Sequence, residues 1–228
     1  MFAVTNTGAN FLRKEGILHR NVPCNRVTGD ALASMIEHQI LLNWVAIECA
    51  RLHRHSDKFS VQFISSTSPR HVSATGATVL YDRISKADGS EVAFVPDAAF
   101  CITRRRDGKS LLFFVEVDMG TEAVTRRKAD SNVDVQQKIA SYRTYLGGRG
   151  YKRYESQAAF NVRSHGFRLL IVVNSTRRRD ALGEFMRRSP HPCGFVWTCD
   201  NASLTRDGIA GKIWMVGGRM GEAPRSIL

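Results

Sequence analysis

One run of nine residues constrains this fold more than any other part of the sequence. Residues 110–118 read Ser-Leu-Leu-Phe-Phe-Val-Glu-Val-Asp, and positions 111–115 and 117 are apolar. A strand that lacks polar alternation is buried on both faces, as the central strands of layered α/β sheets are. We therefore expect residues 110–118 to form a strand in the middle of a sheet.

A hairpin should place a second strand beside this one. Residues 91–102 read as a strand, and the Asp107-Gly108 pair marks a tight turn before residue 110. Asp97 lies in the first strand of this hairpin, directly after a proline. The hairpin should therefore bring Asp97 near the acidic end of the second strand.

Two acidic residues close the second strand. Glu116 and Asp118 are two positions apart, so in a strand their side chains share one face. Three carboxylates in one place repel one another, and burying them is costly unless a positive group binds them. Two interpretations follow: Asp97, Glu116 and Asp118 hold a divalent metal ion, or they pair with some of the many arginines.

Hydrophobic periodicity predicts the other elements. We expect helices at residues 31–54, 122–146 and 176–188, strands at 58–66, 79–84, 167–173 and 194–198, and a loop or short helix at 149–166. The order is helix, strand, hairpin, helix, strand, helix, strand. It predicts an α/β fold with a mixed sheet, in which one helix crosses over to a parallel strand.

The length of 228 residues suits one domain at residues 30–205. Residues 1–29 would be an N-terminal extension, and residues 206–228 a C-terminal tail that is poorly ordered from Gly217. The five cysteines are odd in number and form no Cys-x-x-Cys pair, which favours a reducing compartment. We expect a cytoplasmic protein, because no apolar run is long enough for a membrane span and the first residues lack a signal-peptide pattern.

The formal net charge of +12 and the sequence pI of about 10 favour a polyanionic partner. Nucleic acid comes first, and an anionic membrane surface second. Short basic clusters suit contacts with phosphates. The candidate nucleic-acid-binding residues are Arg104, Arg105, Arg106, Arg126, Arg127, Lys128, Lys152, Arg153, Arg177, Arg178 and Arg179. Nearby tyrosines could stack on unpaired bases: Tyr142, Tyr145, Tyr151 and Tyr154.

Two predicted helices carry further candidates. Glu37 and Glu48 are 11 residues apart, about three helical turns, so both can share one side of the first helix. Lys138 and Tyr142 are four residues apart and also share a side. Lys138 is either a functional cation or a solvated helix residue, and Tyr142 is its partner on the helix or a core residue.

The acidic motif resembles a known nuclease superfamily. Pro96-Asp97 followed by Glu116-Val117-Asp118 is similar to the PD-(D/E)XK pattern, with aspartate where lysine is expected. The longer string, Pro-Asp-Ala-x-Phe, then Phe-x-Val-Glu-Val-Asp-x-Gly-Thr-Glu, then Lys138-x-x-x-Tyr142, resembles the replication-relaxation family of mobile elements. This resemblance covers about residues 30–200.

The resemblance implies a restriction-endonuclease-like core of order α-β-β-β-α-β, Mg²⁺ or Mn²⁺ as cofactor, and DNA as substrate. It implies that Asp97, Glu116 and Asp118 hold the metal, and that Glu37 or Glu48 completes the site. In this superfamily the lysine can migrate to the following helix, and Lys138 stands there at the position of the Gln in the Gln-x-x-x-Tyr motif of RecB-like members. Asp97, Glu116 and Lys138 are then the catalytic residues.

We therefore expect a metal-dependent DNA endonuclease or nickase of a plasmid, phage or transposon. The alternative is a catalytically inactive, nuclease-fold DNA-binding accessory protein in replication or mobilisation, and a third interpretation is a protein-interaction subunit. Other replication, mobilisation or transposition proteins are further partners, a membrane is not, and a homodimer is left open.

Overall fold

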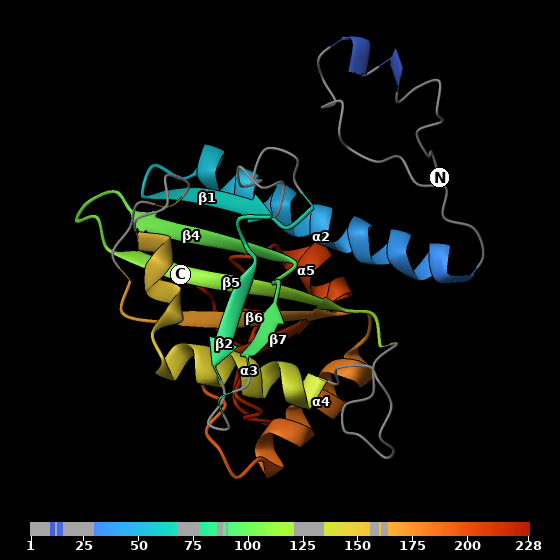
Figure 1. Cartoon of the computed structure of the whole chain (residues 1–228), viewed down its shortest axis with the longest axis vertical. Helices are drawn as coiled ribbons and strands as arrows, with labels where there is room; N and C mark the ends of the chain where they lie inside the picture. Colours follow the sequence, from blue (N-terminus) through green and yellow to red (C-terminus); the bar gives the residue numbers. More distant parts are fainter. Residues whose placement is uncertain are drawn as a thin grey trace.

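The computed structural model describes residues 10–11, 13–15, 30–67, 78–85, 89, 91–120, 135–155, 160 and 164–228, with the side chains of 30–34 left aside. These residues form a six-stranded mixed sheet with helices on both faces and a separate two-stranded hairpin (Figure 1). The expected α/β class, with a mixed sheet flanked by helices, is confirmed.

The sheet begins as an antiparallel meander and continues as a parallel array. Its strand order is β1-β4-β5-β6-β7-β8. β1 pairs with β4 and β4 with β5 in antiparallel fashion, β5, β6 and β7 are parallel, and β8 is antiparallel to β7. The strands are β1 (Phe59–Ser65), β4 (Ala98–Arg104), β5 (Ser110–Asp118), β6 (Phe167–Val173), β7 (Val196–Asp200) and β8 (Met215–Val216).

β5 is the central strand, as its apolar run predicts. It lies between β4 and β6 and changes the sheet from antiparallel to parallel pairing. Phe113 and Phe114 point to opposite faces, and both side chains are fully buried. Alternation along the strand places Glu116 and Asp118 on the same face as Phe114.

The face that carries Phe114 is covered by α3 (Val135–Gly147) and α4 (Thr176–Arg188). The short helix η1 (Gly150–Glu155) and the hairpin of β2 (Asp82–Ser85) with β3 (Glu91–Phe94) lie on the same side (Figure 1). Aromatic rings dominate this core, because Phe114 contacts Tyr142, Tyr145, Tyr154 and Phe167.

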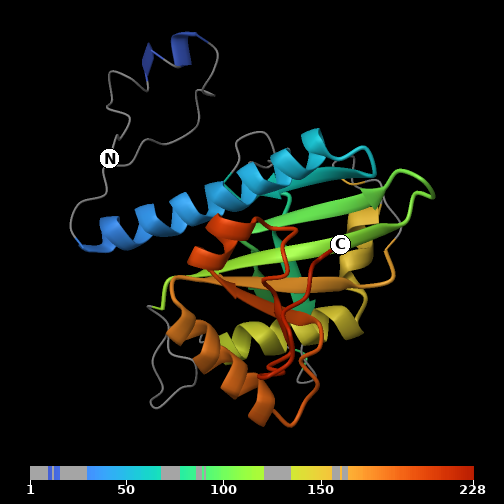
Figure 2. The same cartoon turned by 180° about the vertical axis from the view of Figure 1, so that it is seen from behind.

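The opposite face is covered by α2 (Asp30–His55) and α5 (Asn201–Asp207), together with the C-terminal residues (Figure 2). α2 lies alongside β1 and packs Leu42 and Val45 against the sheet. This long helix confirms the helix expected at residues 31–54 and extends it by one residue at each end.

Several expected boundaries need correction. The strand expected at residues 91–102 is two strands, because Val95, Pro96 and Asp97 interrupt it and proline has no N–H for a ladder. Its first part, β3, pairs with β2 outside the main sheet. The helix expected at residues 122–146 is described only from Val135, because residues 121–134 lie outside the described chain.

The C-terminal segment contradicts the expectation of poor order from Gly217. Ile227 is only 2% exposed, and Arg225 forms a backbone bridge with the buried Trp214. Gly218 has a φ of 72°, and a Cβ there would lie 2.4 Å from the carbonyl oxygen of Gly183, so glycine is required where the chain turns beside α4. The glycine-rich composition suggested a poorly ordered tail, but in the structure the glycine at position 218 allows close packing against α4.

Candidate functional site

Asp97 is positioned by the start of β4. Ala98 pairs with Val115 across the hairpin, so Asp97 comes level with the acidic end of β5. Its Oδ2 accepts a hydrogen bond of 2.8 Å from the backbone N–H of Val117 and lies 3.0 Å from Nε2 of His38 on α2. The Asp97 side chain is 23% exposed. The carboxylate is thus held at the strand edge and is accessible from solvent.

Glu116 lies on the neighbouring strand and faces α3. Its Oε1 accepts a 2.6 Å hydrogen bond from the hydroxyl of Tyr142, and its Oε2 lies 3.7 Å from Nζ of Lys138. Glu116 is only 8% exposed. The structure therefore brings four of the sequence candidates together: Asp97, Glu116, Lys138 and Tyr142.

Electrostatics link these groups into one site. The pKa of Tyr142 is raised well above its usual value, first by burial and then by the negative charge of Glu116, with Asp97 adding to it. The Tyr142 hydroxyl therefore keeps its proton at neutral pH and acts as a fixed donor to Glu116.

His38 is a site residue that the sequence did not single out. The pKa of His38 is raised, mainly by its hydrogen bond to Asp97 and also by the charges of Asp97 and Glu116, while burial and Lys138 lower it. A histidine in the first helix has no spacing signal that ties it to a strand 59 positions later. Only the placement of α2 across the edge of the sheet reveals the contact.

Asp118 has a different partner. Its Oδ2 lies 2.8 Å from Nε of Arg178 on α4, and its Oδ1 accepts a hydrogen bond from the backbone N–H of Gly120. Asp118 is 8% exposed. Within the part of the chain that the structure describes, no group of three His, Cys, Asp or Glu side chains is arranged to hold one ion. Of the two interpretations of the acids, the arginine pair therefore describes Asp118.

Glu48, one of the two first-helix glutamates, does not join Asp97. Glu48 pairs with Arg51 at 2.9 Å and accepts a backbone hydrogen bond from Ile209, just after α5. It lies ten residues beyond His38, about 15 Å farther along the helix axis. Glu48 is therefore too far along α2 to share an ion with Asp97. It instead holds α2 to the segment after α5. Glu37 is exposed beside His38.

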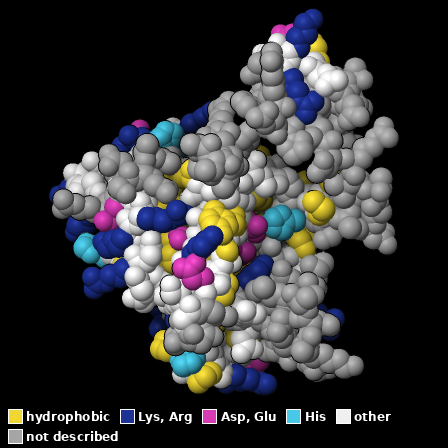
Figure 3. Space-filling model, in the orientation of Figure 1, with side chains coloured by type: hydrophobic (Ala, Val, Ile, Leu, Met, Phe, Trp, Pro, Cys, Tyr) yellow, Lys and Arg dark blue, Asp and Glu magenta, His cyan; other side chains and the backbone are white. Residues whose placement is uncertain are grey.

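The basic clusters lie in several separate places. Figure 3 shows Lys and Arg side chains in scattered groups on one face, with acidic side chains beside some of them. The cluster of Arg104, Arg105 and Arg106 follows the far end of β4, seven residues or about 23 Å from Asp97. Residues 126–128, the predicted cluster of Arg126, Arg127 and Lys128, lie outside the described residues.

Several predicted phosphate-binding residues make internal contacts instead. Arg153 pairs with Asp82 at 2.8 Å and donates to the carbonyl oxygens of Val79 and Tyr81. Lys152 pairs with Glu155 and donates a 2.6 Å hydrogen bond to the carbonyl oxygen of Ser164. These contacts attach the β2–β3 hairpin and the segment after η1 to the domain, which is a structural use of the charge.

The basic cluster at the start of α4 contacts the ends of β5 and β7. Arg178 pairs with Asp118, Arg179 pairs with Asp200 at 2.7 Å, and Arg177 is exposed. Ser175 caps the helix by accepting a hydrogen bond from the N–H of Arg178. Two of these arginines therefore hold α4 to the ends of β5 and β7, and Arg177 faces solvent.

The expectation that tyrosines stack on bases is wrong for Tyr145, Tyr151 and Tyr154, and Tyr142 is a core residue, which was one of its two interpretations. Tyr142, Tyr145, Tyr151 and Tyr154 are each at most 4% exposed, and their rings pack with phenylalanines in the core. Basic residues next to these tyrosines in the sequence therefore did not indicate that the rings are exposed.

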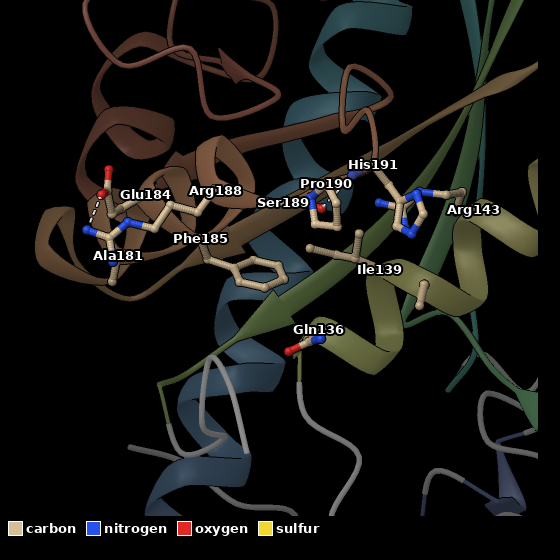
Figure 4. A pocket seen from close by; sticks show the side chains of 11 residues that line it. Gln136, Ile139, Arg143, Ala181, Glu184, Phe185, Arg188, Ser189, Pro190 and His191 are labelled. Atoms are coloured by element: carbon tan, nitrogen blue, oxygen red, sulfur yellow. Dashed lines mark hydrogen bonds and ion pairs between the residues drawn. The ribbon is translucent and has the colours of Figure 1, made fainter. Parts of the chain in front are cut away.

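Two cavities lie in other parts of the domain. One of about 1000 Å³ lies at the far end of the sheet, beside the β4–β5 turn and the C-terminus. The other, of about 630 Å³, lies between α3 and α4 (Figure 4). Neither is lined by Asp97 or Glu116.

None of the helices in the described ranges has the length and apolar character needed to cross a bilayer.

Comparison with known proteins places this chain in a family. The replication-relaxation family matches residues 1–162 of the 228, a range that includes Asp97, Glu116, Lys138 and Tyr142. Proteins of curated function and solved structures gave no match. The chain therefore belongs to the replication-relaxation family.

Proposed function

We propose that this protein is a metal-dependent DNA endonuclease or nickase that acts in the replication or relaxation of a mobile genetic element. The observation that carries the proposal is the meeting of Asp97 and Glu116 on adjacent strands, with His38 against the first and Lys138 against the second. The core order of α2, β1, β4, β5, α3 and β6 also suits the restriction-endonuclease-like fold that the sequence motif implies.

The donor set suits a hard divalent cation. Mg²⁺ is usually held by one or two carboxylates and keeps several water ligands, so Asp97 and Glu116 suffice without a third acid. Asp97 also has an exposed side of its carboxylate toward solvent. When bound, Mg²⁺ or Mn²⁺ would supply Lewis acidity and charge neutralisation at a phosphate.

The residues around these two carboxylates have distinct tasks. Tyr142 fixes the orientation of Glu116, and the N–H of Val117 fixes that of Asp97. Lys138 presents an ammonium group beside Glu116, where it can orient an attacking water and balance the charge of the reacting phosphate. It would thus take the task of the lysine that Asp118 replaces in the motif.

Arg178 neutralises Asp118 and so removes the cost of an acid at the lysine position. Arg177, exposed in the first turn of the same helix, is placed to contact a DNA phosphate next to the site. The remaining exposed basic residues would add salt-sensitive attraction without base specificity.

The second candidate is a DNA-binding protein with this fold that does not cut. It is favoured by one observation: within the described residues the acids already have partners, Glu116 in Tyr142 and Lys138, and Asp118 in Arg178. Such a protein would bind DNA with a steep salt dependence and leave it intact.

A plasmid assay separates the two. Purified protein is incubated with supercoiled plasmid and Mg²⁺ or Mn²⁺, and open-circular and linear products are quantified over time. Glu116→Gln keeps the size and the acceptor for Tyr142 but removes the charge, and Glu222→Gln changes an exposed glutamate on the C-terminal segment as the matched control. Nicking that Glu116→Gln abolishes and Glu222→Gln retains supports the nuclease, and equal products from wild type and Glu116→Gln reject it.

A further inference from the structure

The cavity between α3 and α4 has an apolar centre with unequal ends. Ile139 forms its buried floor, and the half-buried Phe185 points toward it from α4 (Figure 4). Arg143 and His191 lie at one end, and the ion pair between Glu184 and Arg188 lies at the other. A cavity of about 630 Å³ is within the size range of small-ligand sites.

Arg143 is the residue that indicates a ligand. Among the described residues, its Nη2 donates only to the sulfur of Cys193, at 3.4 Å, and thiol sulfur is a weak acceptor. Its Nε is buried and has no acceptor among the described residues. Within those residues no carboxylate pairs with Arg143, whereas Arg178 pairs with Asp118, and Arg179 pairs with both Asp180 and Asp200. A guanidinium without a carboxylate partner can donate to an anion, and phosphate is one of the anions that arginine binds in a planar, two-bond geometry.

Phe185 supplies the second half of the recognition. Its ring is held by the core around Leu182 and Met186, yet part of it faces the cavity. Every nucleobase presents a flat π face, so stacking on a phenylalanine tolerates any base. The carboxylate of Glu184 lies away from Arg143, which orients a bound phosphate toward the Arg143 end.

From this geometry we infer that the cavity binds one unpaired nucleotide of a DNA strand, with the base on Phe185 and the phosphate on Arg143. The inference rests on the proposed function for the identity of the polymer and adds that part of the DNA is single-stranded. Gln136 and Ser189 supply polar groups for the edge of the base.

The cavity lies on the other side of α3 from the acidic site. Gln136, Ile139, Ala140 and Arg143 follow the i, i+3, i+4, i+7 spacing of one helix face, while Lys138 and Tyr142 point to Glu116 from another. A helix with its side chains is about 10–12 Å wide. The bound nucleotide is therefore separate from the phosphate at Glu116 and belongs to DNA that passes over α3.

The test measures binding without chemistry. A fluorescent single-stranded oligo-dT and a duplex of the same length are titrated in EDTA with wild type, Phe185→Leu, Phe185→Tyr, Arg143→Met and Arg206→Met. Phe185→Leu keeps an apolar side chain against the core but removes the π face, and Phe185→Tyr restores a ring. Arg206 is exposed on α5 and serves as the matched loss of one charge.

We expect Phe185→Leu to weaken single-strand binding roughly tenfold, within the usual range for loss of one stacked base, and Phe185→Tyr to restore it. Duplex binding should change little. Arg143→Met should weaken single-strand binding more than Arg206→Met does and lower the salt slope by about one. If Phe185→Leu and Arg143→Met both bind single strands as tightly as Arg206→Met, the inference is wrong.

Two further arms identify the source of the nucleotide and separate this inference from the nuclease. Free dTMP that competes at micromolar concentration would make the cavity a site for free nucleotides and overturn the assignment to a strand, and failure to compete supports the strand. Because the binding assay needs no cleavage, it can succeed while the plasmid assay of Glu116→Gln fails, and the reverse.

Discussion

The hydrogen bond between Tyr142 and Glu116 can be tested by removing a single oxygen atom. Tyr142→Phe deletes the hydroxyl that lies 2.6 Å from Oε1 of Glu116 and leaves the ring in the aromatic core. Both side chains are buried, so water cannot easily replace the lost donor. The carboxylate would keep the ammonium of Lys138 at 3.7 Å.

The magnitude follows from the charge of the acceptor. Hydrogen bonds to charged groups contribute about 1.5–3 kcal/mol, and a buried acceptor left without its donor costs a comparable amount. We expect Tyr142→Phe to lower the free energy of unfolding by about 2 kcal/mol at pH 7. Glu116→Gln keeps an acceptor but removes the charge, so the hydroxyl should matter less in that background.

A double-mutant cycle isolates this interaction. Urea unfolding of wild type, Tyr142→Phe, Glu116→Gln and the double variant gives the coupling free energy, which we expect to be about 1 kcal/mol. Additivity within about 0.3 kcal/mol would show that the hydroxyl does not depend on the charge of Glu116. That result would refute the assignment of Tyr142 as the residue that orients the carboxylate.

Three further predictions follow from particular contacts. Burial raises the pKa of Tyr154 to about 12, against 10 in the unfolded chain. The protonated hydroxyl should therefore contribute its full stability below pH 10 and lose that contribution as the pH rises toward 12. In an alkaline titration, the free energy of unfolding of Tyr154→Phe should fall less between pH 10 and pH 12 than that of wild type. Asp118→Ala should cost about 3–5 kcal/mol in thermal or urea unfolding, because it removes a buried carboxylate that lies 2.8 Å from the mostly buried guanidinium of Arg178, and Arg178→Met in the same background should recover part of the loss. Ile227→Ala should cost about 2–4 kcal/mol by the same measurement, whereas a loosely attached tail would show no effect.

Local sequence patterns predicted the individual strands and helices of this fold better than they predicted which strands pair with one another. The apolar run in β5, the Asp107-Gly108 turn and the helix period of α4 are signals that act over a few residues, and all three elements are present. The break at Pro96 was visible as a residue type, but the separation of β3 from the main sheet was not, because β3 pairs with the preceding strand β2 in a two-stranded hairpin of its own.

The site was predictable where hairpin geometry decides it and not where helix packing does. Asp97 and Glu116 follow from strand register alone, and the four-residue spacing of Lys138 and Tyr142 places both on one side of α3. The contact of His38 with Asp97 depends on how α2 crosses the sheet, and a helix position gives no information about that crossing. The spacing of Glu37 and Glu48 put both on one side of α2, but it did not show that Glu48 lies about 15 Å along the helix axis from His38.

The pairing of Asp118 with Arg178 has a consequence for the proposed chemistry. Three free carboxylates at the ends of these strands would carry a charge of −3, but Arg178 cancels one of them across 2.8 Å. Asp97 and Glu116 then carry −2 between them, and the ammonium of Lys138 beside Glu116 reduces the net charge of this group to −1. One divalent cation is usually held by one or two such carboxylates. Arg178 therefore does for the charge balance what a lysine at position 118 would do, while Lys138 supplies the ammonium group near the reacting phosphate. On this reasoning the proposed site takes a single ion. Aspartate in the lysine position is compatible with a cutting enzyme, because Lys138 on α3 and Arg178 on α4 together supply the positive charge that the missing lysine would provide.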